Sequence, residues 1–127
     1  MEQYLIDNNI ISHYLAGTYS SNCLEFISKV FDAIPNISVI TEIEALSWVH
    51  IDKVKEAIIK ELVSDSNVIS INSKIVEICV AIRRSKRIKT PDAIIAATAL
   101  AFDLTLISSD NIFESIKELK LINPVKL

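Results

Sequence analysis

Short apolar runs alternate with longer segments of helical periodicity along this 127-residue chain. The runs at residues 3–7, 37–40 and 104–108 are each followed directly by polar residues, whereas residues 54–62 and 75–82 repeat their apolar positions at helical spacing. Short apolar runs bounded by polar residues are typical of buried strands, and their alternation with helices indicates βαβ units and a parallel sheet.

The pattern predicts a strand or a helix over most of the chain. With 50% hydrophobic and 23% charged residues, one core is expected, so residues 1–127 are predicted to form a single domain. The simplest architecture is a three-layer α/β/α sandwich. Strands are predicted at 3–7, 37–40, 67–71, 104–108 and 119–123, and helices at 9–16, 20–33, 41–50, 53–64, 73–86, 91–102 and 111–118.

Four acidic residues fall at the junctions between these elements. Asp7, Glu44 and Asp110 follow predicted strands, and Asp92 opens the alanine-rich helix at 91–102. Because ligands of parallel sheets bind outside the carboxyl ends of the strands, the four carboxylates are expected along one rim.

Each acid could instead have a purely structural role at the start of a helix. Thr41-x-x-Glu44 has the form of a capping box, and Thr90-Pro91-Asp92 reads as a helix cap followed by proline and an acid in the first turn. The convergence of the four acids favours a site instead. Carboxylates about 5 Å apart repel by ~3 kcal/mol per pair at an effective dielectric near 20, so such a cluster needs a cation. Hard oxygen ligands select Mg²⁺ or Mn²⁺.

Four sequence runs, at residues 4–9, 37–44, 91–100 and 106–113, together resemble the PIN domain, specifically the VapC-type toxins of toxin–antitoxin pairs. The resemblance covers nearly the whole chain. It implies a five-stranded parallel sheet in the order 3-2-1-4-5 and metal-dependent hydrolysis of RNA. It also implies a cognate antitoxin, and a homodimer is expected. Asp7, Glu44 and Asp92 would hold Mg²⁺ or Mn²⁺, Asp110 would be the fourth acid, and Asn9 and Ser108 would support them.

The chain departs from the family pattern at two positions. Asn8 stands where the family usually has Thr or Ser, and Ser108 replaces a common Thr while keeping the hydroxyl. Glu42 competes with Glu44 for the second acidic position, but residues two apart on a helix lie about 200° apart, so only one can face the rim. The family pattern favours Glu44.

The formal net charge of −3 is unfavourable for binding a polyanion. Basic residues nevertheless gather directly ahead of Asp92, where they could bind the RNA backbone, form a solvated helix end or receive an acidic segment of the antitoxin. Trp48, one turn after Glu44, could stack a base or pack in the core or a dimer. The basic residues, called the basic stripe below, are Arg83, Arg84, Lys86, Arg87 and Lys89.

Several other classes of protein are disfavoured. The single glycine argues against nucleotide-binding loops, and the lack of a signal peptide or long apolar run predicts a cytoplasmic protein without a membrane segment. Cys23 and Cys79 are expected to be reduced, and their spacing with His13 and His50 gives no support for zinc. A small-molecule phosphatase would need an acid where Asn9 stands. A non-catalytic PIN module would be expected to lack one of the acids.

Overall fold

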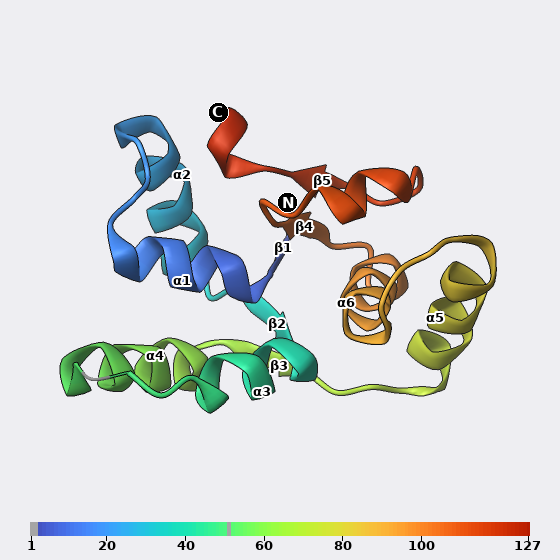
Figure 1. The fold of residues 1–127 in the computed structure, drawn as a ribbon, viewed down its shortest axis with the longest axis horizontal. Helices are drawn as coiled ribbons and strands as arrows, with labels where there is room; N and C mark the ends of the chain where they lie inside the picture. The colour runs from blue at the N-terminus through green and yellow to red at the C-terminus, as the bar shows by residue number, and fades with distance from the viewer. Residues whose placement is uncertain (1–2, 51) are drawn as a thin grey trace.

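The computed structural model describes residues 3–50 and 52–127. Its centre is a five-stranded sheet in the order β3-β2-β1-β4-β5, and all the paired strands are parallel (Figure 1). The predicted sheet and strand order are therefore confirmed. The strands are β1 (Tyr4–Ile6), β2 (Asn36–Ser38), β3 (Asn67–Ile69), β4 (Thr105–Ile107) and β5 (Leu121–Ile122).

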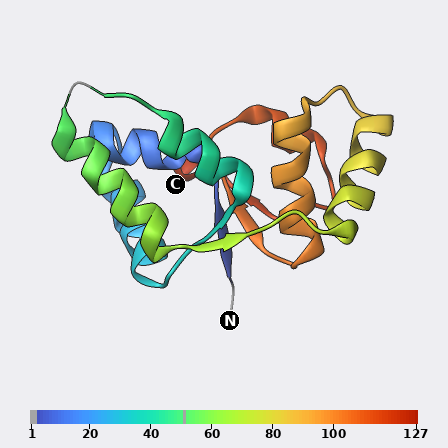
Figure 2. The same cartoon turned by 90° about the horizontal axis from the view of Figure 1, so that it is seen from below.

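Helices cover both faces of the sheet, which confirms the three-layer arrangement (Figures 1 and 2). Successive strand residues point to opposite faces. Leu5 and Leu106 accordingly pack with α5 and α6, while Ile6 and Ile107 pack in the core shared with α1, α2 and α4. The helices are α1 (Asn8–Ala16), α2 (Ser21–Asp32), α3 (Val39–Ser47), α4 (Lys53–Asp65), α5 (Ser73–Ser85) and α6 (Thr90–Ala101), with 3₁₀ helices η1 (Asn111–Ser115) and η2 (Pro124–Lys126).

The start of α3 differs from the prediction. The expected strand 37–40 and helix 41–50 are replaced by β2 ending at Ser38 and α3 beginning at Val39. Ser38 is the helix cap, because its Oγ accepts a 3.0 Å hydrogen bond from the backbone N–H of Ile40. Thr41 is buried inside the first turn. The capping box predicted from Thr41 to Glu44 is therefore wrong.

Three further elements also differ from the prediction. Helix α6 begins at Thr90 with Lys89 in the cap position and no side-chain cap, so the predicted capping role of Thr90 is wrong. The expected helix 111–118 is the shorter 3₁₀ helix η1, and the expected strand 119–123 is reduced to β5. The segment between them buries Ile116 and Leu119 in the same core as Phe113.

The two cysteines lie in the cores on opposite sides of the sheet. Cys23 packs with α1 and α2, and Cys79 packs with α5 and α6. Both are free thiols, and burial raises the pKa of each. The intervening sheet excludes a zinc site shared between them. Among the helices of residues 3–50 and 52–127, none is long and apolar enough to cross a membrane.

Candidate active site

Asp7 lies at the carboxyl end of β1 and forms the cap of α1. Its side chain is only 7% exposed, and both carboxylate oxygens are held by hydrogen bonds. Oδ1 accepts from the backbone N–H of Asn8 at 2.8 Å. Oδ2 accepts from Ser108 Oγ at 2.8 Å and from Asn9 Nδ2 at 3.2 Å. The carboxylate is therefore fixed in orientation before any ligand binds.

The pairing of β1 with β4 brings Ser108 to Asp7. Ile6 pairs with Ile107, so the next residue of each strand stands at the same rim of the sheet. Ser108 Oγ also accepts from the backbone N–H of Asp110 at 3.1 Å and from Asn9 Nδ2 at 3.2 Å. Asn9 Oδ1 accepts in turn from the backbone N–H of Ser109 at 3.3 Å. Asn9 and Ser108 thus tie the first acid to the loop that carries the fourth.

The carboxylates at this rim act on one another electrostatically. Burial, the largest cause, raises the pKa of Asp7 from 3.8 to about 6; hydrogen bonds from Ser108 and Asn8 oppose the rise, and the charges of Glu44 and Asp92 add to it. Burial and the charge of Asp92 raise the pKa of Glu44. Burial and the charge of Asp110 raise the pKa of Asp92, whereas Lys89 lowers it. The fold therefore places each of the four predicted acids close enough to at least one other to interact with it electrostatically.

The four acids differ in how firmly they are placed. Glu44, rather than Glu42, is the α3 acid whose charge acts on Asp7. Asp92 lies half-buried in the first turn of α6, and Asp110 is exposed at the start of η1, where Oδ1 accepts from the backbone N–H of Ile112 at 3.0 Å. In the described part of the chain, no group of three or more His, Cys, Asp or Glu side chains stands ready-made to hold a metal ion.

Among the described residues, no cationic side chain forms a salt bridge with an acid of the rim. Within residues 3–50 and 52–127, the salt bridges use other acids: Glu25, Glu56, Asp103 and Glu114. A buried carboxylate without a bound cation is costly in its charged form, as the raised pKa of Asp7 reflects.

The basic stripe covers the end of α5 and the loop that leads to α6. All of its members are exposed except Lys86, which is half-buried. Arg83 has a structural contact, since its Nε donates a 3.2 Å hydrogen bond to the carbonyl of Ile88 and so holds this loop. Lys89 stands close enough to Asp92 to lower its pKa. The stripe therefore ends beside the acidic rim.

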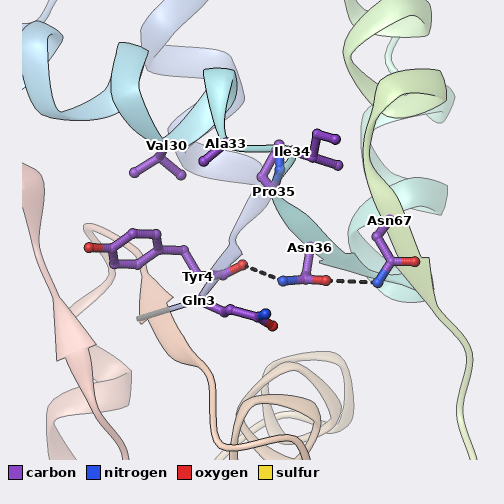
Figure 3. Close-up of a pocket in the computed structure, with 8 residues that line it drawn as sticks. All are labelled: Gln3, Tyr4, Val30, Ala33, Ile34, Pro35, Asn36 and Asn67. Atoms are coloured by element: carbon purple, nitrogen blue, oxygen red, sulfur yellow. Dashed lines mark hydrogen bonds between the residues drawn. The ribbon is translucent and has the colours of Figure 1, made fainter. Parts of the chain in front are cut away.

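Two hollows lie at opposite ends of the sheet. One, of about 230 Å³, is lined by Glu44, Asn8 and Trp48 and opens beside the acidic rim. From the sequence, Trp48 is predicted to stack on a base or to pack, and Asn8 is noted only as a departure from the family pattern. Both residues line one hollow because α1 packs against α3. The other hollow, of about 320 Å³, lies at the amino ends of the strands (Figure 3).

None of the described residues that line the hollow in Figure 3 is acidic. Asn67 Nδ2 donates to Asn36 Oδ1 at 2.7 Å, and Asn36 Nδ2 donates to the carbonyl of Tyr4 at 3.1 Å. These amides link three neighbouring strands, so their observed role is to bind the sheet together. The acids all belong to the opposite edge, where parallel sheets bind their ligands.

The fold and the site together define a class of protein: an α/β/α domain with an acidic rim at the carboxyl ends of its parallel strands. The sequence profile of the PIN domain family matches residues 4–119, so the chain belongs to the PIN domain family. A search of curated protein sequences gives no match.

Solved structures extend the comparison to whole chains. A toxin–antitoxin complex from Klebsiella pneumoniae contains a chain that is 28% identical, with a TM-score of 0.74 over 96% of this chain and 98% of that one. FitAcB from Neisseria gonorrhoeae is 21% identical, with a TM-score of 0.80 over 98% and 100% of the two chains. DNA-bound VapBC from Salmonella typhimurium is 16% identical, with a TM-score of 0.79 over 98% and 99%. The last two, at these identities, show the shared fold.

Proposed function

We propose that this PIN domain is the toxin of a toxin–antitoxin pair and acts as a metal-dependent endoribonuclease on single-stranded or loop RNA. The observation that carries the proposal is Asp7, a buried carboxylate whose pKa is raised by burial and by the charges of Glu44 and Asp92. Family membership and the similarity to a chain of a toxin–antitoxin complex support it.

Asp7, Glu44 and Asp92 would hold Mg²⁺ or Mn²⁺, with Asp110 as the fourth acid. The donor set fits, because carboxylate oxygens are the ligands that these hard cations prefer. A cation would also relieve the repulsion that raises the pKa values of Asp7, Glu44 and Asp92. Asp7 is already held by hydrogen bonds, so the more exposed Glu44 and Asp92 would turn toward it on binding.

When bound, the cation would lower the pKa of a water molecule and offset negative charge at the scissile phosphate. The chain's own residues position the groups around it. Ser108 and Asn9 hold the Asp7 carboxylate in one orientation. Asp110 would bind a second cation or hold the attacking water. Arg84, Arg87 and Lys89 are exposed and would bind the phosphates that flank the cleaved bond.

The proposed partner is an antitoxin protein that accompanies this toxin. Its acidic segment would dock on the basic stripe, which is exposed and ends beside the site. A docked acidic segment would compete with RNA for the same cations, which explains in physical terms how a partner could silence the enzyme.

The test is cleavage of a loop-containing RNA by the purified, partner-free protein. We expect cleavage with Mg²⁺ or Mn²⁺, none in EDTA, and a loss of about 10²-fold for Glu44→Gln. Glu42→Gln is the matched control, because it removes the same charge two residues away on the same helix. Full activity of Glu44→Gln would contradict the proposed metal site. Hydrolysis of a small phosphate ester without RNA cleavage would indicate a phosphatase, and neither activity would indicate a non-catalytic module.

A further inference from the structure

The hollow beside Glu44 has no role in the proposed chemistry. It lies among α1, α3 and α4, which run side by side in Figure 2. Its volume is about 230 Å³, and its apolar walls come from Ile11, Ala45 and Ile59. Glu44 lines it and also belongs to the acidic rim, so whatever occupies the hollow is adjacent to the site of cleavage.

Trp48 supplies an aromatic surface at this hollow. Trp48 is the C-cap residue that follows α3, and the residue is 40% exposed. Its ring packs edge-on against His50, with the ring centroids 4.7 Å apart. His50 is itself held by two hydrogen bonds of 2.9 Å. Its backbone N–H donates to Glu56 Oε1, and its ring Nδ1 accepts from the backbone N–H of Asp52. The indole is therefore braced yet open to a ligand.

Asn8 supplies an unused hydrogen-bonding group. Its side chain is half-buried and lines the hollow, but its amide has no hydrogen-bond partner among the described residues. Because Asn8 is only half-buried, its amide donor and acceptor are open to solvent and are available to a ligand. Asn8 is one of the two positions where the chain departs from the family pattern.

The remaining polar groups of the lining present acceptors. Ser12 Oγ donates its proton to the carbonyl of Asn8, and Ser47 Oγ donates to the carbonyl of Ile43. The oxygens of both serines are left with lone pairs that can accept a hydrogen bond. A ligand that brings its own donor is therefore favoured.

We infer that this hollow receives one unpaired base of the RNA, stacked on Trp48 and read by Asn8. The inference rests on the proposed cleavage of RNA at the adjacent acids. Unpaired bases bind proteins by stacking on aromatic side chains and by hydrogen bonds at their edges. An Asn amide can pair with an exocyclic amino group and the neighbouring ring nitrogen of a base. With Ser12 and Ser47 offering lone pairs beside the Asn8 amide, the amino edge of adenine or cytosine is favoured over the carbonyl edge of uracil.

The first experiment measures nucleotide binding through Trp48, which is the single tryptophan of the chain. The 5′-monophosphates of adenosine, cytidine and uridine contain no internucleotide bond, so they report binding without cleavage. With Mg²⁺ present, adenosine and cytidine monophosphates should quench the fluorescence saturably, and uridine monophosphate should bind about tenfold more weakly. Ribose 5-phosphate is the control without a base. Equal quenching by all four compounds, or none by any, would overturn the inference.

The second experiment measures RNA cleavage by variants. Trp48→Leu, which keeps an apolar side chain but removes the ring, should raise KM by about tenfold, and Trp48→Phe should stay close to the parent. Asn8→Ala leaves the backbone N–H bond to Asp7 available. It should weaken, but not abolish, the preference for adenine and cytosine, because the amide that pairs with the base is lost while Ser12 and Ser47 remain. Phe102→Leu is the control, an exposed aromatic at the far end of α6.

The outcomes separate the two proposals. RNA cleavage that is indifferent to Trp48→Leu overturns the base pocket and leaves the nuclease standing. The same result with weakened binding of the antitoxin shows that the hollow is a protein-docking surface. Base-selective nucleotide binding without RNA cleavage supports the base pocket and contradicts the nuclease.

Discussion

Ser108 donates a 2.8 Å hydrogen bond to the carboxylate of Asp7, although the two residues are 101 positions apart in the sequence. The parallel pairing of β1 with β4 creates this contact, because Ile6 and Ile107 are paired and the chain leaves both strands at the same rim. A hydrogen bond to a carboxylate stabilises its charged form. Ser108 therefore offsets part of the effect of burial on the pKa of Asp7.

Ser108→Ala should raise the pKa of Asp7 further, because it removes a hydrogen bond that favours the carboxylate. It should also destabilise the fold by about 1–3 kcal/mol, since Ser108 is fully buried and its partners lose a hydrogen bond. Ser108→Thr, which keeps the hydroxyl, should restore the pKa. NMR titration of the Asp7 carboxyl carbon and urea unfolding measure the two effects. An unchanged pKa in Ser108→Ala would contradict the positioning role.

Stability without metal should fall as the pH rises from about 4 to about 6. The folded protein binds a proton at Asp7 more tightly than the unfolded chain does, because the folded pKa is about 6 and the ordinary value is 3.8. This contribution is present in full below the ordinary value and is lost as the pH passes through the folded value, by up to about 3 kcal/mol. Glu44 and Asp92 act in the same direction.

Urea unfolding in EDTA across this pH range measures that loss. Asp7→Asn removes the titrating group, so the difference in unfolding free energy between parent and variant isolates Asp7 from the other acids. The variant should lose less stability than the parent between pH 4 and 6. Parallel curves for the two proteins would show that Asp7 ionises at its ordinary pKa.

The sequence predicted the sheet and the place of Asp7 well, because both depend on local patterns. An apolar run that ends in a polar residue marks a strand and its carboxyl end in the sequence itself. The start of α3 was missed because Val39 and Ile40 are β-branched and read as strand, whereas Ser38 caps the helix with no loop between. Local preference is overridden there by packing of the first turn into the core.

Thr41 and Ser38 provide a direct test of this correction. Thr41→Val should be neutral or stabilising, because the buried Thr41 hydroxyl has no hydrogen-bond partner among the described residues and the substitution keeps its shape. Ser38→Ala should cost about 1 kcal/mol, as expected for loss of a helix cap. Thermal unfolding in EDTA measures both. A loss for Thr41→Val with none for Ser38→Ala would restore the capping box.

The candidate site was less accessible from sequence than the fold. The acids could be named because each lies at an element boundary, but the roles of Asn8 and Trp48 depend on the contact between α1 and α3. The distinct role of Arg83 was also hidden, since its hydrogen bond to the carbonyl of Ile88 follows from the course of the loop. Sequence spacing predicts the side of a helix on which a residue lies. It does not predict which other helix packs against that side, because that depends on the tertiary fold.

The basic stripe should contribute to RNA binding through Arg84 and Arg87. Changing both to Glu should weaken RNA binding and lower the slope of log K against log salt by roughly one to two, with metal affinity unchanged. Lys74→Glu with Lys117→Glu is the matched control, because both lysines are exposed and outside the stripe. An unchanged slope would indicate a solvated helix end. Normal RNA binding with lost antitoxin binding would make the stripe a docking surface.

The Asp92→Asn variant tests whether Asp92 is a metal ligand or a helix cap. Its carboxylate has no hydrogen bond or salt bridge among residues 3–50 and 52–127, and its pKa is raised by burial and by Asp110. In EDTA at neutral pH, Asp92→Asn should therefore be as stable as the parent or more stable by about 1 kcal/mol, since repulsion is removed. Asp110→Ala is the contrasting variant, because Asp110 Oδ1 caps η1 and the loss of this acceptor should cost up to about 1 kcal/mol.

Millimolar Mn²⁺ should then raise the melting temperature of the parent far more than that of Asp92→Asn. A ligand that binds the folded state alone stabilises it by about 2.7 kcal/mol at a hundred times its Kd, and an incomplete site binds too weakly to gain this. Calorimetry with and without Mn²⁺ measures the difference. If Asp92→Asn is less stable in EDTA and gains as much from Mn²⁺ as the parent, Asp92 is a structural residue and the metal is held without it.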